Sequence, residues 1–360
     1  MTQTPRGGGP TASPRVRLVD VAREAGLSKT TVSAALNGTG RMSEAVRERA
    51  REAARRLGYR PNATARLLRA GHARLIGYAV GEFATSPWAY LDSPYYARLT
   101  SATAQAALQH GYALVMLPTS SGPGEWADLP LDAAIVADPM AGDPIVEDFI
   151  AARIPVFTDR SVEGRAGAFW VDIDTDAAVT EVLDHLRAEG ARRIALVLPD
   201  TAIRFHAALV DSYRAWCAGH GAEPREEFSS GPGNGPAIAA VERALSAAEP
   251  PDALLVASEA SPPLILDAAR RHGRTVPGDL LLVCISEDAA AEHADPPVST
   301  LSLQPALVAV AGVELLVAAL ESGETEPTGT LVDTRLEIRA SSRRRSEGTR
   351  RRTGVRAGDE

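Results

Sequence analysis

Apolar residues repeat at helical spacing in three short segments near the start of the chain. In chain order they are Leu18, Val21, Ala22 and Ala25; Val32, Ala35 and Leu36; and Val46, Ala50, Ala53 and Leu57. Gly26 ends the first segment, Ser28 precedes the second as an N-cap, and Ser43 opens the third, which ends at Gly58. The pattern predicts three helices around a small core.

From residue 75 the pattern changes to apolar runs that alternate with amphipathic segments. The runs suit buried parallel strands: Leu75–Val80, Tyr112–Leu117, Ala133–Val136, Pro155–Thr158, Arg193–Leu198, Ala253–Ala257 and Leu280–Ile285. Helical spacing lies between most of them, at 97–110, 145–153, 177–189, 207–220, 236–248 and 262–272. This alternation predicts a doubly wound α/β architecture. It is long enough to divide into two lobes.

These patterns divide the chain into five parts. We expect a disordered leader at 1–15, a three-helix domain at 16–61 and, after Pro61, a short helix-competent hinge at 62–70. The α/β part follows at 74–340, and an Arg-rich, low-complexity tail at 341–360 is expected to be disordered.

The net charge of −8 is distributed unevenly. Residues 1–73 carry +9, residues 74–340 carry −21 and the tail carries +4. A basic head on an acidic body is expected when a small domain binds a polyanion. A solvated basic surface without a partner fits the charge equally well.

Other features narrow the class of protein. No apolar run reaches the ~18 residues of a membrane span, and the N-terminus lacks the apolar stretch of a secretory signal. Two cysteines and seven scattered histidines form no metal-ligand pattern, and the glycine-rich segment 231–236 lacks the Lys-Ser/Thr of a phosphate loop. We therefore expect a cytoplasmic protein with no membrane contact, metal, cofactor or catalytic residues, and not an enzyme.

The first two predicted helices are joined by the turn Gly26-Leu27-Ser28, as in a helix-turn-helix. The outward face of 28–37 carries short or polar side chains that can reach base edges and phosphates. A generic three-helix bundle with a polar face is the alternative.

The segment 18–38 (LVDVAREAGLSKTTVSAALNG) resembles the headpiece of lactose-repressor-type (LacI/GalR) transcription regulators, and the match continues ungapped through 57–68 (LGYRPNATARLL). The resemblance implies base reading by Lys29 and Thr30 and phosphate or base contacts by Thr31, Ser33 and Asn37. It places Tyr59 and Asn62 against phosphates, and Leu68 as a minor-groove wedge beside Ala65. The DNA-binding candidates are Ser28, Lys29, Thr30, Thr31, Ser33, Asn37, Arg41, Tyr59, Asn62, Ala65 and Leu68. Two positions depart from the family: Ala34 replaces a frequent arginine, and Arg17 replaces a threonine N-cap.

Residues 75–340 resemble, more weakly, the periplasmic-binding-protein-like effector domain of the same family. Ser93-Pro94-Tyr95-Tyr96 resembles a cleft motif, and Val276–Asp279 and Pro296–Pro305 resemble two late signatures. The fold implied is a helix-turn-helix headpiece with a hinge helix, followed by a two-lobed α/β domain whose cleft binds an effector. The effector-binding candidates are Tyr95, Tyr96, Asp174, Arg204, Glu259, Ser286 and Glu287.

The cleft departs from the sugar-binding members of the family. Ser258-Glu259 replaces Asn-Asp, Ser286-Glu287 replaces Asp-Asp, and the expected arginine falls on Ala207 or Leu209, with Arg204 nearby. Because the groups that grip vicinal hydroxyls are displaced, we expect a cationic or amphipathic ligand rather than a free sugar. Alternatively, the two glutamates face solvent and the cleft has no ligand; Tyr95 and Tyr96 fit a binding platform or core filling equally well.

The resemblance implies a transcription regulator, a repressor, that binds a palindromic operator as a homodimer and responds to an unidentified small molecule. Two alternatives are a solute-binding protein without DNA function and an enzyme on the two-lobed scaffold. The basic head argues against the first, and the lack of a nucleophile–base grouping argues against the second.

Overall fold

The computed structural model describes residues 16–59, 72–81, 93–118, 126, 129–140, 142–161, 167–201, 203–231, 233–258, 260–323 and 326–344. The chain forms two compact units, Met1–Ala73 and Arg74–Glu360. The predicted hinge, most of the loop 119–129 and the leader lie outside the described residues, as do Asn62, Ala65, Leu68 and Glu259.

The first unit contains the three predicted helices, α1 (Leu18–Ala25), α2 (Lys29–Leu36) and α3 (Glu44–Arg56). Ser28 and Ser43 are the N-caps of α2 and α3, as predicted: each side-chain oxygen accepts a backbone N–H. Gly26 ends α1 in the left-handed conformation that glycine adopts without strain. Alanines and valines from the three helices form the core, with Val21, Val32, Ala50 and Ala53 fully buried.

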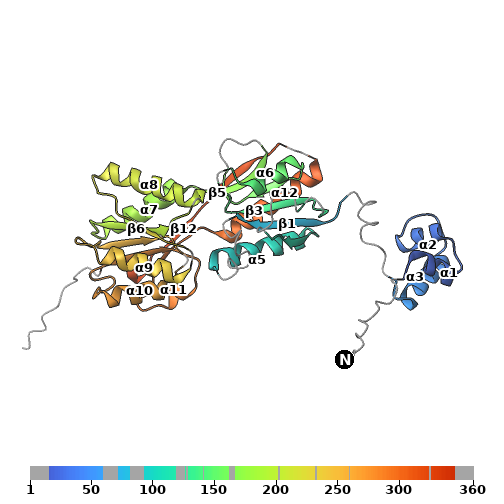
Figure 1. Cartoon of the computed structure of the whole chain (residues 1–360), viewed down its shortest axis with the longest axis horizontal. Helices are drawn as coiled ribbons and strands as arrows, with labels where there is room; N and C mark the ends of the chain where they lie inside the picture. The colour runs from blue at the N-terminus through green and yellow to red at the C-terminus, as the bar shows by residue number, and fades with distance from the viewer. Residues whose placement is uncertain are drawn as a thin grey trace, which may run out of the picture. The chain divides into compact units, whose positions relative to one another are not determined.

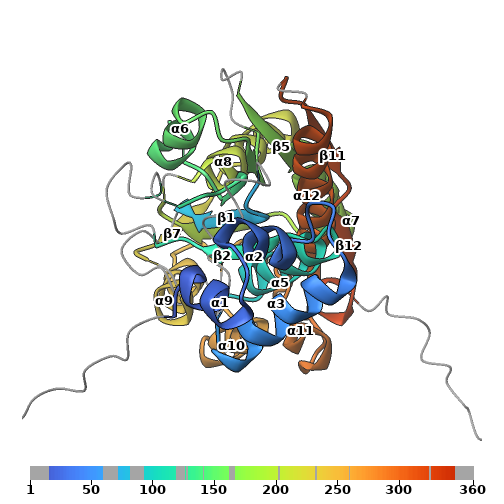
Figure 2. The ribbon, with the colours of Figure 1, turned by 90° about the vertical axis from the view of Figure 1, so that its right-hand side faces the viewer.

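The second unit contains two α/β lobes, which Figure 1 shows side by side. The sheet of lobe 1 has the order β11-β5-β4-β3-β1-β2. Its strands are β1 (Leu75–Val80), β2 (Ala113–Met116), β3 (Ala133–Ala137), β4 (Val156–Thr158), β5 (Ala168–Ile173) and β11 (Gly329–Val332). Helices α5 (Pro94–Gln109) and α12 (Pro305–Ser322) cover one face, and α6 (Pro144–Ala151) covers the other (Figure 2).

The sheet of lobe 2 has the order β12-β10-β9-β8-β6-β7. Its strands are β6 (Ile194–Pro199), β7 (Glu226–Ser229), β8 (Ala253–Val256), β9 (Leu281–Ile285), β10 (Ser299–Ser302) and β12 (Arg335–Glu337). Its helices are α7 (Thr175–Ala188), α8 (Arg204–His220), α9 (Asn234–Leu245), α10 (Pro262–Arg271) and α11 (Ala290–His293). All pairings are parallel except that of β12 with β10, so the predicted doubly wound architecture is confirmed.

The chain passes between the lobes in three described segments. It leaves lobe 1 between β5 and α7, returns between β10 and α12, and leaves again between β11 and β12. Each sheet therefore contains strands that are far apart in the sequence. Three connections between the same two lobes are compatible with a hinge motion that opens and closes the space between them.

The sequence-based prediction lacks strands β5, β7, β10, β11 and β12, and it differs from the structure in two further features. Helix α12 was not predicted because it is apolar nearly all round; it is long and apolar enough to cross a membrane, but Val308, Val313 and Leu316 are fully buried on lobe 1. The predicted disordered tail begins too early at 341. Ser341 and Ser342 are fully buried in a 3₁₀ turn, where the Ser341 hydroxyl donates to the Leu282 carbonyl.

Candidate functional site

The exposed face of α2 carries two kinds of polar side chain. Ser28 and Thr31 serve the helix start: the Ser28 hydroxyl accepts the Thr31 N–H at 3.0 Å, and the two hydroxyls lie 2.8 Å apart. Asn37 serves the helix end, because its amide donates to the Ser33 carbonyl at 2.6 Å. These predicted DNA contacts therefore also stabilise the helix that carries them.

Lys29 and Thr30 are exposed in the first turn of α2, and Arg41 is exposed in the loop after it. The positive charges of α3 are largely paired with acids. Arg51 bonds Glu44 at 2.9 Å, and Arg55 bonds Glu48. Among the residues described in this unit, Lys29 and Arg41 have no ion pair, so their charges remain available to a polyanion.

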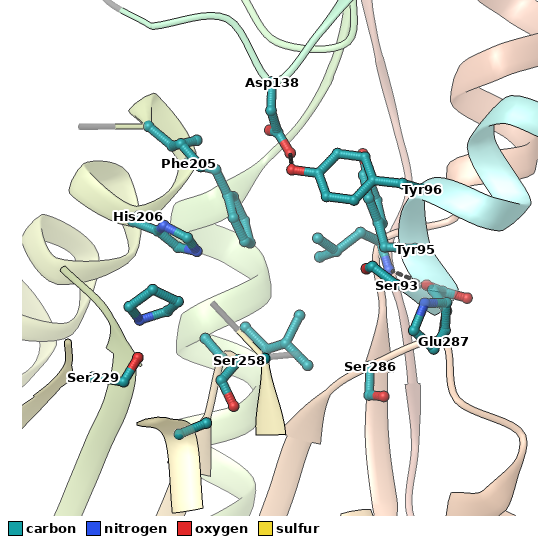
Figure 3. A pocket seen from close by; sticks show the side chains of 18 of the residues that line it. Ser93, Tyr95, Tyr96, Asp138, Phe205, His206, Ser229, Ser258, Ser286 and Glu287 are labelled. Atoms are coloured by element: carbon teal, nitrogen blue, oxygen red, sulfur yellow. Dashed lines mark hydrogen bonds between the residues drawn. The ribbon is translucent and has the colours of Figure 1, made fainter. Parts of the chain in front are cut away.

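A pocket lies between the lobes of the second unit, at the carboxyl ends of parallel strands from both sheets (Figure 3). Ligands of open α/β sheets bind at such ends. The lining residues are Ser93, Pro94, Tyr95, Tyr96, Asp138, Arg160, Pro199, Ile203, Phe205, His206, Ser229, Gly231, Gly233, Ala237, Ala257, Ser258, Ile285, Ser286, Glu287, Asp288 and Leu303.

The lobe 1 wall of this pocket is a buried hydrogen-bond network. The Tyr96 hydroxyl donates to Asp138 at 2.5 Å, and the Tyr95 hydroxyl donates to Asp159 at 3.0 Å. Arg160 donates to the Tyr95 hydroxyl at 3.1 Å, and its Nε lies 3.7 Å from Asp138 Oδ1. The two tyrosine rings meet edge-on at 5.2 Å. Tyr95 and Tyr96 thus both position this network.

The network holds two carboxylates beside one guanidinium. Burial, and then the nearby Asp138 charge, raise the pKa of Asp159 to about 7, against the lowering effect of Arg160. Burial also raises the pKa of Tyr95 well above its usual value, so its hydroxyl keeps its proton. The wall is therefore close to neutral near pH 7.

The lobe 2 wall contains hydroxyls and rings. Ser229, Ser258 and Ser286 lie at or just beyond the ends of β7, β8 and β9, and Figure 3 shows them along one side of the pocket. Phe205 and His206 come from the first turn of α8. Burial lowers the pKa of His206, whose Nδ1 lies 2.6 Å from the Thr201 hydroxyl, so the ring is neutral at pH 7.

Four of the predicted effector residues line the pocket: Tyr95, Tyr96, Ser286 and Glu287. Two others lie elsewhere. Asp174 caps α7 by accepting the Ala177 N–H at 2.9 Å, and Arg204 begins α8 without lining the pocket. The seventh, Glu259, lies outside the described residues.

Sequence reasoning missed Asp138, Arg160, Phe205 and His206. Asp138 directly follows β3, and Arg160 follows β4 by two residues. Because ligands gather at the carboxyl ends of parallel strands, polar residues after each apolar run are the signal that could have identified these two. Phe205 and His206 have no such signal, because nothing in the pattern shows that α8 begins at the cleft.

Glu287 also connects the two lobes. It is 5% exposed and accepts hydrogen bonds from the Ser302 hydroxyl and the Leu303 N–H. Its other oxygen lies 3.4 Å from the guanidinium of Arg98 on α5. Burial raises the pKa of Glu287. The residue therefore borders the pocket and joins α5 of lobe 1 to lobe 2.

Two family models match the chain. Residues 17–62 match "Bacterial regulatory proteins, lacI family", and residues 183–342 match "Periplasmic binding protein-like domain". The regulator CelR of Thermobifida fusca is 28% identical over 341 residues, covering 91% of this chain and 98% of CelR. Catabolite control protein A of Staphylococcus xylosus is 24% identical over 338 residues, covering 91% and 99% of the two chains.

Solved structures agree with these matches. A CelR–cellobiose complex has a TM-score of 0.67 at 25% identity, covering 91% of this chain and 100% of the other. A lac repressor dimer bound to operator and an anti-inducer has a TM-score of 0.77 at 20% identity, covering 92% and 100%. The second likeness supports the fold: a helix-turn-helix headpiece and a two-lobed α/β domain.

Proposed function

Because the chain belongs to the LacI/GalR family of helix-turn-helix transcription regulators, we propose that it represses transcription by binding a palindromic operator as a homodimer. A small molecule in the pocket between the lobes modulates this binding. The observation that carries the proposal is a helix-turn-helix whose α2 exposes Lys29 and Thr30, within a segment of charge +9 on an otherwise acidic chain.

On this proposal Lys29 and Thr30 read bases in the major groove, since they occupy the first turn of a recognition helix. Arg41 binds phosphate. Four polar residues stabilise the ends of α2 through hydrogen bonds and contact the phosphate backbone with their remaining donors and acceptors: Ser28, Thr31, Ser33 and Asn37. Tyr59, Asn62, Ala65 and Leu68 extend the contact through the hinge, as the family resemblance implies.

The effector acts through the lobes. Both walls of the pocket contribute side chains, so a ligand that contacts both stabilises one degree of closure over another. Homodimerisation links that closure to the spacing of two headpieces on two half-sites. A small movement of the two lobes thereby changes the free energy of operator binding.

Gel-shift and footprint experiments on DNA upstream of the gene and its neighbours test this function. We expect a protected site with two related halves. Lys29→Ala should reduce the preference for this site over random DNA by about 1–3 kcal/mol per lost base contact. Arg23→Ala removes an exposed charge from α1 (79% exposed) and should leave that preference unchanged. An unchanged preference in Lys29→Ala would contradict the assignment.

A further inference from the structure

The hydrogen-bonding capacity left over in the pocket is mostly donor capacity. Two of its three acidic residues, Glu287 and Asp288, are already occupied by protein donors. Glu287 accepts from Ser302, Leu303 and Arg98, and Asp288 accepts from the Ser261 hydroxyl at 2.5 Å and the Ala290 N–H at 2.9 Å. A cationic ligand would have to compete with these donors for the same oxygens.

The serines of the lobe 2 wall have the opposite character. The Ser258 oxygen accepts the Ala260 N–H at 3.3 Å, and the Ser286 oxygen accepts the Asp288 N–H at 3.1 Å. Neither hydroxyl proton has an acceptor within the described part of the chain. Both hydroxyls are therefore available to donate to a ligand oxygen.

A buried arginine adds a further donor. Arg160 is 3% exposed, and among the described residues its Nε has no hydrogen-bond partner. Asp138 Oδ1, 3.7 Å away, is the one unpartnered buried acceptor found beside it. Buried polar atoms normally find partners, so this pair points to a group that the protein alone does not supply.

Two helices begin at the same pocket. Their N-caps, Ile203 of α8 and Gly233 of α9, both line it, and neither helix has a side-chain cap. The helices have 17 and 12 residues, and the partial positive charge at their N-termini favours an anion. The space between the walls is apolar, bounded by Phe205, Ile285 and Leu303.

From these observations we propose that the effector is a small aromatic carboxylate. Its carboxylate accepts hydrogen bonds from Ser258 and Ser286, and its ring lies against Phe205. A free sugar fits less well, because its several hydroxyls would compete for few open acceptors, of which Asp138 Oδ1 is one. The inference deepens the proposed function and rests on it, because it identifies the ligand of the regulator's pocket.

Isothermal titration calorimetry on the full-length protein without DNA tests the proposal. The probes are benzoate, neutral benzyl alcohol, cationic benzamidinium, and cellobiose. We expect benzoate to bind about tenfold or more tightly than the other three, because charge-assisted hydrogen bonds are about twice as strong as neutral ones. The double variant Ser258→Ala/Ser286→Ala should lose about tenfold in benzoate affinity.

A matched double variant, Ser101→Ala/Ser246→Ala, removes two exposed hydroxyls outside the pocket, one on α5 and one at the C-cap of α9, and should bind benzoate like the wild type. Three results would overturn the proposal: benzamidinium or cellobiose binding as tightly as benzoate, no benzoate binding at millimolar concentration, or unchanged affinity in the Ser258/Ser286 variant. Operator binding is measured separately on ligand-free protein. A negative result for ligand binding therefore does not contradict the DNA-binding proposal. A negative result for operator binding likewise does not contradict the ligand proposal.

Discussion

Asp159 is a carboxylic acid in the interior of lobe 1. It is fully buried, its two oxygens accept hydrogen bonds from the Asp138 N–H and the Tyr95 hydroxyl, and its pKa is raised from 3.8 to about 7. Because the folded state holds this proton more strongly than the unfolded chain, the folded state binds more protons between about pH 4 and pH 7. The free energy of unfolding therefore falls as the pH rises through this range.

Replacing Asp159 by asparagine should remove that pH dependence. The amide keeps an acceptor for the Asp138 N–H and offers a donor to the Tyr95 hydroxyl. Relative to the wild type, Asp159→Asn should gain about 2–3 kcal/mol of stability as the pH rises from 5 to 8. Denaturant unfolding at the two pH values measures this gain. A difference between variant and wild type that does not change with pH would show that Asp159 ionises normally.

Helix α12 packs on the sheet of lobe 1 through one close contact between its backbone and an aromatic ring. Gly312 is buried where the helix crosses Phe157 of β4, and a Cβ there would lie 2.2–2.6 Å from three atoms of that ring. Only glycine allows the helix to pack this closely on the sheet. The helix in turn packs against α5, whose first turn supplies Tyr95 and Tyr96 to the pocket.

Gly312→Ala should therefore destabilise the protein by about 1–3 kcal/mol, although alanine is the better helix former. Gly219→Ala on α8 is the matched control, since that glycine is exposed and nothing lies within 4 Å of the added Cβ. The control should gain up to about 1 kcal/mol. Equal shifts in the free energy of unfolding for the two variants would contradict the packing argument.

The sequence predicts the elements that have a clear apolar run or a clear helix-capping residue. Runs such as Leu75–Val80 and Ala253–Ala257 correspond to strands, and Ser28 and Ser43 correspond to N-caps. It missed α12, which has no polar face to give a period, and short strands such as β12, which pairs through a distant segment. It identified Tyr95 and Ser286 in the pocket, but not Phe205, because its place depends on how the second lobe packs against the first.

Among the described residues of the second unit, Arg98 of lobe 1 and Glu287 of lobe 2 form the ion pair that joins the lobes. Its two ends differ sharply: Arg98 is 53% exposed and Glu287 is 5% exposed. Exposed charges contribute little to the free energy of unfolding. Removal of a buried acceptor costs more, because it leaves its hydrogen-bond donors without a partner.

Arg98→Ala should cost less than about 1 kcal/mol of stability. Glu287→Ala should cost about 1–3 kcal/mol, because the Ser302 hydroxyl and the Leu303 N–H lose their acceptor. Glu287→Gln keeps that acceptor and should lie between them. Urea unfolding of the three variants separates the contributions; an Arg98→Ala cost equal to that of Glu287→Ala would assign the effect to the ion pair instead.

The proposed function requires this chain to read a symmetric DNA site as a homodimer. Selection of bound sequences from a pool of random duplexes, with the full-length protein, tests this requirement. We expect enrichment of an inverted repeat whose half-sites are centred about one helical turn apart, or a multiple of it. Enrichment of a single asymmetric site, or of no sequence above the starting pool, would contradict it.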